Sequence, residues 1–406
     1  TLITDRTEEQ HMREAVVVAS KRTPLAKGYR GSFNMTRPDD QAAHAIRAAL
    51  GDVPSVADAD VEDVIMGCGL PEGPSGQNVG RIASLRAGLP SSVPGTTVNR
   101  FCSSGLNTIA MASHRVMVGE VDTIVAGGVE SISLVQNDNF RSVDLYNQPL
   151  MEDWPGIYLS MGETAEIVAK RYGISREDQD AYSLQSQQRV AAAQDAGWYA
   201  EDIAPMTVNR AVKQPDGSFG VEEGHVFGSD ECNRPTTTLE GLASLPPVFD
   251  PDNGSVTAGN ASQFADGASA AVITSRERAD ALGLEPLGTF RGFQVAGVDP
   301  DEMGIGPVKA VPKLLDMVGL TLDDIDIVEL NEAFASQVLY CQRVLEIPDD
   351  KLNPMGGSIA IGHPYGMSGA RMVGQILRHL KRTGGRYGIV TMCVGGGQGA
   401  AGLFEV

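Results

Sequence analysis

Residues 96–128, TTVNRFCSSGLNTIAMASHRVMVGEVDTIVAGG, hold the pattern that decides the fold of this chain. The pattern predicts an extended run over Thr96–Phe101, a small-residue helix over Gly105–Val118 and a strand over Thr123–Gly128. Strands that alternate with helices at this rhythm are typical of layered α/β proteins. Cys102 stands where the extended run gives way to the helix, so the same stretch carries a candidate reactive group.

The same rhythm continues on both sides of this stretch. Upstream it predicts strands over Glu14–Ala19 and Val61–Met66, and helices over Asp40–Leu50 and Ser75–Ala87. The layering breaks after Ser133 and resumes at Ser255. In between we expect a helix over Gly162–Arg171, a second helix opened by the capping pair Ser175 and Asp178, and loops over 205–255.

These changes divide the chain into an expected set of units. We expect residues 12–133 plus 251–285 to form an N-terminal half, residues 134–250 to form a loop insertion, and residues 286–406 to form a C-terminal half. Residues 1–11 are polar and precede the first strand pattern. We expect them to be an added leader outside the fold.

A weak internal repeat relates the two halves. The run Val61–Met66 resembles Ile325–Leu330, and Cys102 and His363 each follow one of these runs by a similar distance. Each is then followed by a small-residue helix and by a strand that ends in glycines. If the halves pack about a pseudo-two-fold axis, Cys102 and His363 face each other.

Composition excludes several classes of protein. The chain has 406 residues, with 32 Lys and Arg against 52 Asp and Glu, for a net charge of −20. This acidity argues against nucleic acid or an anionic membrane surface as a partner. The sequence has no run of ~18 apolar residues that would span a membrane, and its 42% hydrophobic content is enough for a sizeable core.

The five cysteines suggest a reducing compartment. They stand far apart, at positions 68, 102, 232, 341 and 393, and no two form a CxxC pair. An odd number of separated cysteines favours free thiols and a cytoplasmic location. No His or Cys pair has zinc-ligand spacing, so we expect no metal site.

Four polar or thiol residues stand at junctions where a strand ends. Cys102 begins a helix, whose dipole is predicted to lower the thiol pKa; the alternative is a buried structural Cys. His363 precedes Pro364 at a second helix start, where it either caps the turn or meets a ligand. Asn331 is either a helix cap or an amide that positions a water. Cys393 opens a glycine loop with Gly395, and the N–H groups of such a loop can hold an oxyanion.

One stretch matches a cofactor-binding motif but lacks the elements that such a motif requires. Gly397–Gly402 fits the GxGxxG pattern of dinucleotide-binding folds. Only Leu403–Val406 follow it, so there is no crossover helix and no downstream acidic residue for a ribose.

Together these motifs resemble those of the thiolase family. Four of them match in order, namely Asn99-Arg-Phe-Cys-Ser-Ser-Gly105, Asn331-Glu-Ala-Phe-Ala335, Gly362-His-Pro364 and Cys393-x-Gly-Gly-Gly-x-Gly399. Thr257-Ala-Gly-Asn-Ala-Ser262, with Asp266-Gly-Ala268, matches a further family motif. The resemblance covers about residues 13–406. It implies a thiolase-like layered fold of two similar βαβαβ-type halves carrying a helical and loop insertion domain.

The resemblance also implies an activity and roles for the matched residues. Thiolases exchange acyl groups between coenzyme A (CoA) thioesters. Cys102 would become acylated, His363 would take its proton, and Cys393 would protonate the departing acetyl-CoA carbanion. Asn331 would hold a water that supports the enolate. The N–H groups of Cys102 and Gly395 would support the tetrahedral intermediate.

Substrate contacts follow from the same resemblance. The insertion would bind the pantetheine arm of CoA, and the residues expected to contact substrate are Ser262, Met161, Arg234, Ala258 and Phe334. Acyl-CoA and CoA are the expected partners, with no metal or tightly bound cofactor. Family analogy predicts a homodimer or homotetramer.

Departures from the family pattern bear on chain length. Ser160 replaces a His common in acetoacetyl-CoA thiolases, and Met355, Tyr365, Met367 and the Gln263-Phe264 pair also differ from common family residues. We therefore favour a 3-ketoacyl-CoA thiolase of the β-oxidation type with broad or medium chain length. Three alternatives remain: an acetyl-CoA C-acetyltransferase, a ketoacyl synthase and a non-catalytic acyl-CoA-binding protein of this fold.

Overall fold

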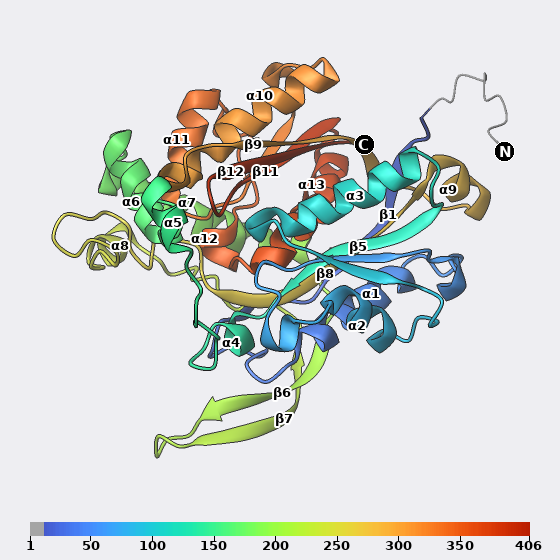
Figure 1. The fold of residues 1–406 in the computed structure, drawn as a ribbon, viewed down its shortest axis with the longest axis horizontal. Coiled ribbons are helices and arrows are strands. Elements are labelled where there is room, and N and C mark those ends of the chain that lie inside the picture. Colours follow the sequence, from blue (N-terminus) through green and yellow to red (C-terminus); the bar gives the residue numbers. More distant parts are fainter. Residues whose placement is uncertain (1–11) are drawn as a thin grey trace.

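A computed structural model describes residues 12–406 of the chain, so the expected leader over 1–11 lies outside the described residues. The layered α/β architecture expected from the sequence is confirmed (Figure 1). None of the helices in residues 12–406 is long and apolar enough to cross a membrane.

The first half contains the segment that the sequence pattern identified. Its elements are β1 (Ala15–Arg22), β2 (Ala26–Lys27), α1 (Pro38–Gly51), β3 (Val64–Gly67), α2 (Val79–Arg86), β4 (Gly95–Val98), α3 (Ser104–Met117), β5 (Thr123–Glu130), α4 (Ile132–Val135), β8 (Ala265–Ser275) and α9 (Arg276–Leu282). The strand–helix–strand prediction around Cys102 therefore holds, with β4, α3 and β5 in the expected places.

The second half repeats this plan. Its elements are β9 (Gly288–Gly297), α10 (Gly306–Val318), β10 (Ile327–Leu330), α11 (Ala335–Leu345), α12 (Ser358–Ile361), α13 (Tyr365–Thr383), β11 (Tyr387–Val394) and β12 (Gln398–Glu405). His363 lies directly before α13, as Cys102 lies directly before α3.

Sheet topology shows the internal repeat directly. The strand order is β10-β11-β12-β9-β1-β8-β5-β3-β4, with β2 added beside β8. In each half one parallel pair, β3–β5 or β10–β11, is followed by two antiparallel pairs, β5–β8 and β8–β1 or β11–β12 and β12–β9. The halves join where β1 pairs with β9 at Val16–Thr289 and Val17–Gly288.

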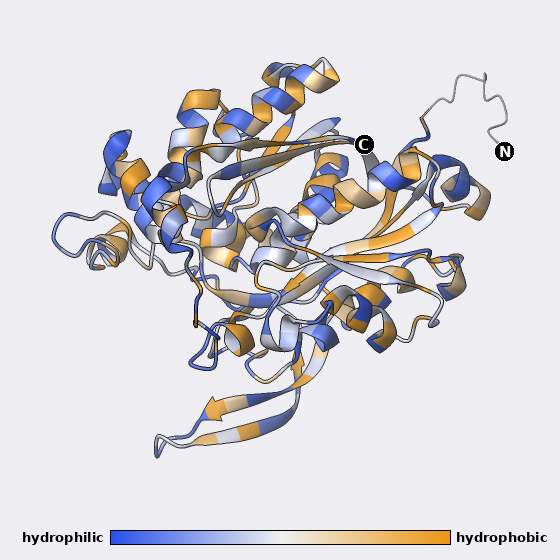
Figure 2. Cartoon of the chain, in the orientation of Figure 1, coloured by the Kyte–Doolittle hydropathy of each residue, from blue (hydrophilic) through white to orange (hydrophobic). Residues whose placement is uncertain are grey.

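Alternation along the strands separates the core into layers. Val64 and Met66 pack with α1 and α2 on one face, whereas Ile65 packs with α3 and α13 on the other. In the second half, Val328 packs with α10 and α11. Helices α3 and α13 therefore lie between the two half-sheets, and α1, α2, α10 and α11 cover the outside. Figure 2 shows polar and apolar residues alternating along these outer helices, as one-sided burial requires.

Glycines allow the two central helices to approach closely. A Cβ at Gly105 would lie 2.6 Å from the Gly366 carbonyl oxygen, and one at Gly369 would lie 2.4 Å from the Leu106 amide nitrogen. Larger residues could not be accommodated there without moving a backbone segment. This contact places the N-terminal ends of α3 and α13 side by side, which brings together the turns that carry Cys102 and His363.

Residues 134–250 differ in one respect from the sequence prediction. They hold α5 (Gln148–Asp153), α6 (Met161–Arg171), α7 (Arg176–Asp195), β6 (Met206–Lys213), β7 (Phe219–Phe227) and α8 (Leu239–Ala243). Ser175 caps α7 by accepting the Asp178 N–H, as predicted. The region 205–255 is not loop throughout, because β6 and β7 form an antiparallel hairpin. Its turn contains Pro215-Asp216-Gly217, a hairpin signal that the sequence prediction missed.

Candidate active site

Cys102 lies in a short 3₁₀ turn, Phe101–Ser103, that leads into α3. The turn begins with Phe101 at φ 40°, a left-handed conformation that a bulky residue rarely adopts. Cys102 itself is buried. The sulfur of Cys102 is within hydrogen-bonding reach of the Gly395 N–H, which comes from the loop after β11. The nucleophile candidate of the first half therefore meets the glycine loop of the second half.

His363 is buried, and both ring nitrogens have partners. Nδ1 lies 2.6 Å from the Ser368 hydroxyl oxygen, and Ser368 in turn donates to the Pro364 carbonyl at 3.0 Å. Because that hydroxyl proton is already used, Ser368 accepts a hydrogen bond from Nδ1–H. This contact leaves a lone pair on Nε2, to which the Asn331 side-chain N–H donates at 3.2 Å.

Asn331 is held in place by the first residue of α12 and by β11. Its side-chain carbonyl accepts the Ser358 hydroxyl at 2.6 Å, and its backbone N–H donates to the Thr391 carbonyl at 2.9 Å. The amide that faces His363 is therefore fixed by β11 and by the residue that starts α12. The Asn331 amide and the His363 imidazole are therefore in direct contact.

Burial keeps both partners of the proposed thiol–imidazole pair uncharged. It raises the pKa of Cys102 to about 12; the N–H groups of Gly395 and Cys102 lower that pKa, and the charge of Glu130 raises it. The expected lowering of the Cys102 pKa by the helix dipole is therefore wrong in its net direction, because desolvation outweighs the dipole. Burial, followed by the charge of Arg371, lowers the pKa of His363 to about 3.

Cys393 lies near the end of β11. It is fully buried in an apolar cluster that includes Phe334, with Met161 packed against the cluster. Burial raises the pKa of Cys393 well above the usual thiol range, and the charges of Cys102 and Cys341 add to this effect. Met161 also approaches Gly395, where a Cβ would lie 3.7 Å from the Met161 sulfur and 3.3 Å from the Phe101 ring.

The remaining predicted contacts lie in an adjoining pocket or on its border. A pocket of about 280 Å³ is lined by residues that include Arg234, Ala258 and Gln263. The Gln263 carbonyl accepts the His363 N–H at 2.9 Å, so this pocket borders the His363 turn. Ser262 precedes Gln263 and donates its N–H to the Ala333 carbonyl at 2.9 Å. These contacts connect the pocket that contains Arg234 and Ala258 with Ser262 and with the His363 turn.

Sequence reasoning missed the residues that hold this region in place. Ser368 fixes the imidazole and Ser358 fixes the Asn331 amide. Gln263, noted in the sequence only as a departure from common family residues, ties the pocket to the His363 backbone. The only available signal for Ser368 was a hydroxyl residue within the helix that His363 precedes.

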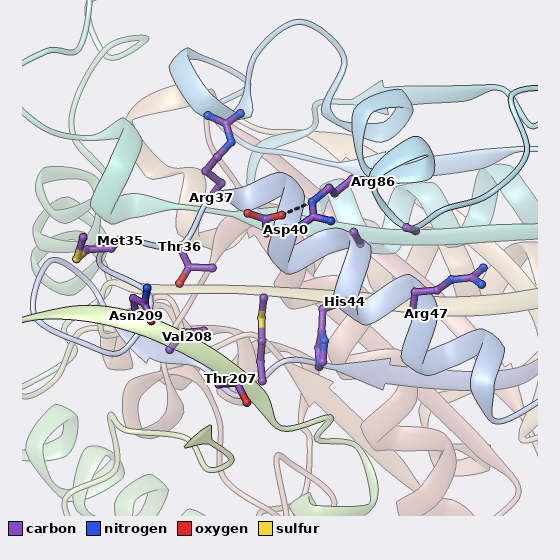
Figure 3. Close-up of a pocket in the computed structure, with 13 residues that line it drawn as sticks. Met35, Thr36, Arg37, Asp40, His44, Arg47, Arg86, Thr207, Val208 and Asn209 are labelled. Carbon is purple, nitrogen blue, oxygen red and sulfur yellow. Dashed lines mark hydrogen bonds and ion pairs between the residues drawn. The ribbon is translucent and has the colours of Figure 1, made fainter. Parts of the chain in front are cut away.

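A separate surface pocket contains none of the predicted site residues. Figure 3 shows this pocket of about 630 Å³, between α1 and β6 and lined by residues that include His44, Arg86 and Val208. Its Arg86 is paired with Asp40, as the dashed line marks, and Arg47 is paired with Asp58. These ion pairs leave little free positive charge to attract an anion, so the Cys102 region is the better candidate.

Comparison with known proteins agrees with this geometry. The model of the family "Thiolase, N-terminal domain" matches residues 15–277, and that of "Thiolase, C-terminal domain" matches residues 284–406. The 3-ketoacyl-CoA thiolase of Bacillus subtilis (strain 168) is 47% identical over 395 residues, which cover 97% of this chain and 100% of the relative.

Two solved structures are also similar. Human mitochondrial 3-ketoacyl-CoA thiolase in complex with CoA has a TM-score of 0.85 and 39% identity, covering 97% of this chain and 98% of that chain. The Bacillus anthracis acetyl-CoA acetyltransferase has a TM-score of 0.86 and 35% identity, covering 98% of this chain and 100% of that chain. With both family domains matched and a full-length relative at this identity, the chain belongs to the thiolase family.

Proposed function

We propose that this chain is an acetyl-CoA C-acyltransferase that cleaves 3-ketoacyl-CoA with CoA, through an acyl-Cys102 intermediate. The observation that carries the proposal is the convergence of residues from both halves at the N-terminal ends of α3 and α13. One thiol, Cys102, lies within reach of the Gly395 N–H, a second thiol, Cys393, lies close to it, and His363 is oriented by Asn331 and Ser368. The relatives named 3-ketoacyl-CoA thiolase support the same activity.

The first half-reaction uses both thiols. As the Cys102 sulfur forms a bond to the keto carbon, its proton passes to His363 Nε2, the ring nitrogen with a lone pair. The carbon–carbon bond then breaks, its electron pair leaves with acetyl-CoA as an enolate, and the Cys393 thiol donates a proton to that enolate. The products are acetyl-CoA and a thioester on Cys102.

The second half-reaction restores the starting enzyme. The Cys393 thiolate takes the proton of the incoming CoA thiol, and the CoA sulfur bonds to the acyl carbon. The Cys102–acyl bond breaks, and Cys102 regains its proton from His363. Atoms and charges balance because each thiol ends in the state in which it began.

Because Cys102 and His363 are uncharged before substrate binds, the proposed reaction depends on groups that stabilise its oxyanions. The pKa of His363 lies far below that of Cys102, so transfer of the proton before attack is disfavoured by ~1.4 kcal/mol for each unit of difference. Proton transfer would therefore accompany attack. The N–H groups of Cys102 and Gly395 would hold the tetrahedral oxyanion, and His363 with an Asn331-held water would hold the thioester enolate.

Substrate binding is assigned to the insertion in this proposal. Residues 134–250 would serve as the substrate-binding unit between the halves 12–133 plus 251–285 and 286–406. The pantetheine arm would lie in the pocket that contains Arg234 and Ala258, next to Ser262. Met161 and Phe334 would line the reacting end beside Cys393.

The site also bears on the alternative activities. An acetyl-CoA C-acetyltransferase would use the same residues on a shorter acyl group, so only chain-length preference separates it from the main proposal. A ketoacyl synthase is less well supported because Cys393 stands in the glycine-loop region near Cys102. A non-catalytic binding protein would have no need of the oriented His363–Asn331 pair.

Thiolysis of a chain-length series tests the proposed function. Acetoacetyl-CoA and longer 3-ketoacyl-CoA substrates should each lose enolate absorbance only when CoA is present, with the highest kcat/KM at medium length. Omission of CoA is the internal control. If no substrate of any length shows CoA-dependent loss, the chain is not a thiolase in activity. A maximum at acetoacetyl-CoA would favour the acetyltransferase alternative.

Replacing Ser368 tests how His363 is oriented. Ser368→Ala removes the acceptor for Nδ1–H, so the imidazole can populate the tautomer that has no lone pair on Nε2. We expect kcat to fall at least about tenfold, which corresponds to ~1.4 kcal/mol of lost transition-state stabilisation. Steady-state kinetics of Ser368→Ala and Ser368→Thr provide the measurement. Rescue by Thr, which keeps the hydroxyl, is expected, whereas equal activity in Ala and wild type contradicts this orientation.

Localisation and assembly stay predictions within this proposal. The cytoplasmic location and the homodimer or homotetramer expected from the sequence go with the proposed activity. Light scattering of the purified chain measures the second of these.

A further inference from the structure

Glu130 ends β5 as a fully buried carboxylate. Its Oε2 accepts the backbone N–H groups of Gly69 at 2.7 Å and Gly366 at 2.8 Å, and its Oε1 accepts that of Leu70 at 3.0 Å. The Cys68 thiol donates to Oε1 at 3.8 Å. The partners of this carboxylate are thus backbone amides and a thiol rather than a cation, and no role in the proposed reaction accounts for it.

These contacts tie together three separate parts of the chain. Gly69 and Leu70 follow β3, Glu130 ends β5, and Gly366 lies in the first turn of α13, just after His363. The junction is crowded, since a Cβ at Gly69 would lie 2.9 Å from Tyr365 Cβ and 3.0 Å from Glu130 Oε2. Any shift of the carboxylate therefore moves the start of α13, from which His363 projects.

Glu130 also acts on Cys102 through its charge. The titratable groups that face it are Cys68, at the end of β3, Cys102, before α3, and Tyr365, on α13. The charge of Glu130 raises the pKa of each, in addition to burial. Across the sheet it pairs with Gly267, and the neighbouring carboxylate Asp266 is bonded to Ser133.

The charge of Glu130 depends on pH near neutrality. Burial raises the pKa of Glu130 to about 7, and the N–H groups of Gly69, Gly366 and Leu70 lower it. At higher pH the carboxylate is ionised, and at lower pH it is neutral.

We propose that Glu130 is a positioning residue that holds the first turn of α13, and with it His363, against the Cys102 turn. This inference rests on the proposed function, because it takes Cys102 as the nucleophile. A protonated Cys102 loses its proton only to His363 during attack, and the same carboxylate fixes the position of that base. The negative charge of Glu130 would add to burial in disfavouring the Cys102 thiolate, and so would help to protect the thiol from alkylation and oxidation between turnovers.

Thiol reactivity tests the role of the charge without any substrate. Wild type, Glu130→Gln and Glu130→Asp are treated with methyl methanethiosulfonate from pH 5.5 to 9, and the Cys102 peptide is quantified by mass spectrometry. Glu130→Gln should react about three- to tenfold faster than wild type at pH 8, because removal of the negative charge lowers the Cys102 pKa. The ratio should approach one at pH 5.5, where wild-type Glu130 is itself neutral. Glu130→Asp, which keeps the charge, should react like wild type.

Glu329 offers a matched control for the loss of a buried charge. It is a fully buried carboxylate on β10, and burial likewise raises its pKa to about 7. Its side chain contacts Gln375 on α13, and it does not contribute to the pKa of Cys102. Glu329→Gln should therefore leave the pH profile of Cys102 modification unchanged. A Glu130→Gln profile identical to wild type, or an equal shift in Glu329→Gln, overturns the role of the Glu130 charge.

Steady-state thiolysis tests the positioning role. Glu130→Asp keeps the charge but shortens the side chain by one methylene, so it cannot reach Gly69, Leu70 and Gly366 together. We expect its kcat to fall at least about tenfold while KM for CoA changes less than about threefold, because the Arg234 pocket does not contact Glu130. If the kcat of Glu130→Asp equals that of wild type, the positioning role of Glu130 is wrong. If Glu130→Gln does not fold, Glu130→Asp alone still tests this role. If wild type shows no thiolysis, the proposed function fails, while the thiol-modification result still decides the role of the charge.

Discussion

Cys102→Ala is expected to abolish acyl-enzyme formation and to lower kcat for thiolysis by roughly 10⁴-fold or more. The side chain removed is the thiol in the turn before α3, whose sulfur lies within reach of the Gly395 N–H. Cys393, the second thiol of the site, exchanges protons in the proposed reaction and does not carry the acyl group. The proposed reaction then lacks a group to carry the acyl chain between its two halves.

Mass spectrometry after incubation with acetyl-CoA provides the measurement. Wild type should gain one acetyl group on the peptide that contains Cys102, and Cys102→Ala should gain none. Cys341→Ala is the matched control, because it removes a thiol of similar burial that donates to the Gly304 carbonyl. If Cys102→Ala is labelled as well as wild type, another residue is the nucleophile.

The sequence predicted those parts of the fold that depend on local pattern. The strands and helices around Cys102 follow from alternation and small-residue periodicity, and the repeat of Val61–Met66 in Ile325–Leu330 anticipated the equivalent strands β3 and β10. The hairpin of β6 and β7 was missed because its strands have weak apolar alternation and are largely exposed. The local sequence pattern therefore did not indicate these two strands.

The candidate site was predicted in its residues but not in its energetics. Cys102, His363, Asn331 and Cys393 could be found because each stands where a strand ends near glycines. The direction in which the Cys102 pKa shifts could not be predicted, because it depends on how much water the folded chain excludes from the thiol. Contacts such as Gly366 with Glu130 join residues far apart in sequence, so no spacing rule reveals them.

The glycine excess of the sequence has a specific structural consequence. Gly105 and Gly369 allow α3 and α13 to touch through their backbones, and Gly128 lies so close to Gly366 that a Cβ there would be 1.8 Å from its carbonyl oxygen. Two helices that approach this closely fix the distance between the turns that precede them. The glycines thus determine the geometry of the thiol and imidazole without taking part in the chemistry.

Cys393→Ala is expected to affect turnover of 3-ketoacyl-CoA much more than acetylation of Cys102. Acetylation of Cys102 by acetyl-CoA should persist, because Cys102 and the donors of its oxyanion remain in place and CoA can leave as a thiolate, which needs a proton far less than a carbanion does. Turnover of 3-ketoacyl-CoA should fall by about 10²–10⁴-fold, the usual contribution of a positioned general acid or base. Burial holds Cys393 as a thiol by raising its pKa, so in wild type it carries the proton that the departing enolate needs.

Deuterium exchange into the methyl group of acetyl-CoA gives the sharpest readout for this variant. That exchange requires a base to remove the α-proton and return a deuteron, which is the reverse of the role proposed for Cys393. The variant should therefore acetylate Cys102 in a burst, yet lose both exchange and steady-state thiolysis. Cys341→Ala, whose thiol lies near Cys393, should keep all three activities and so controls for loss of a buried sulfur. Wild-type exchange in Cys393→Ala would assign the proton to another group, with His363 as the first to test, because its Nε2 is the other basic atom of the site.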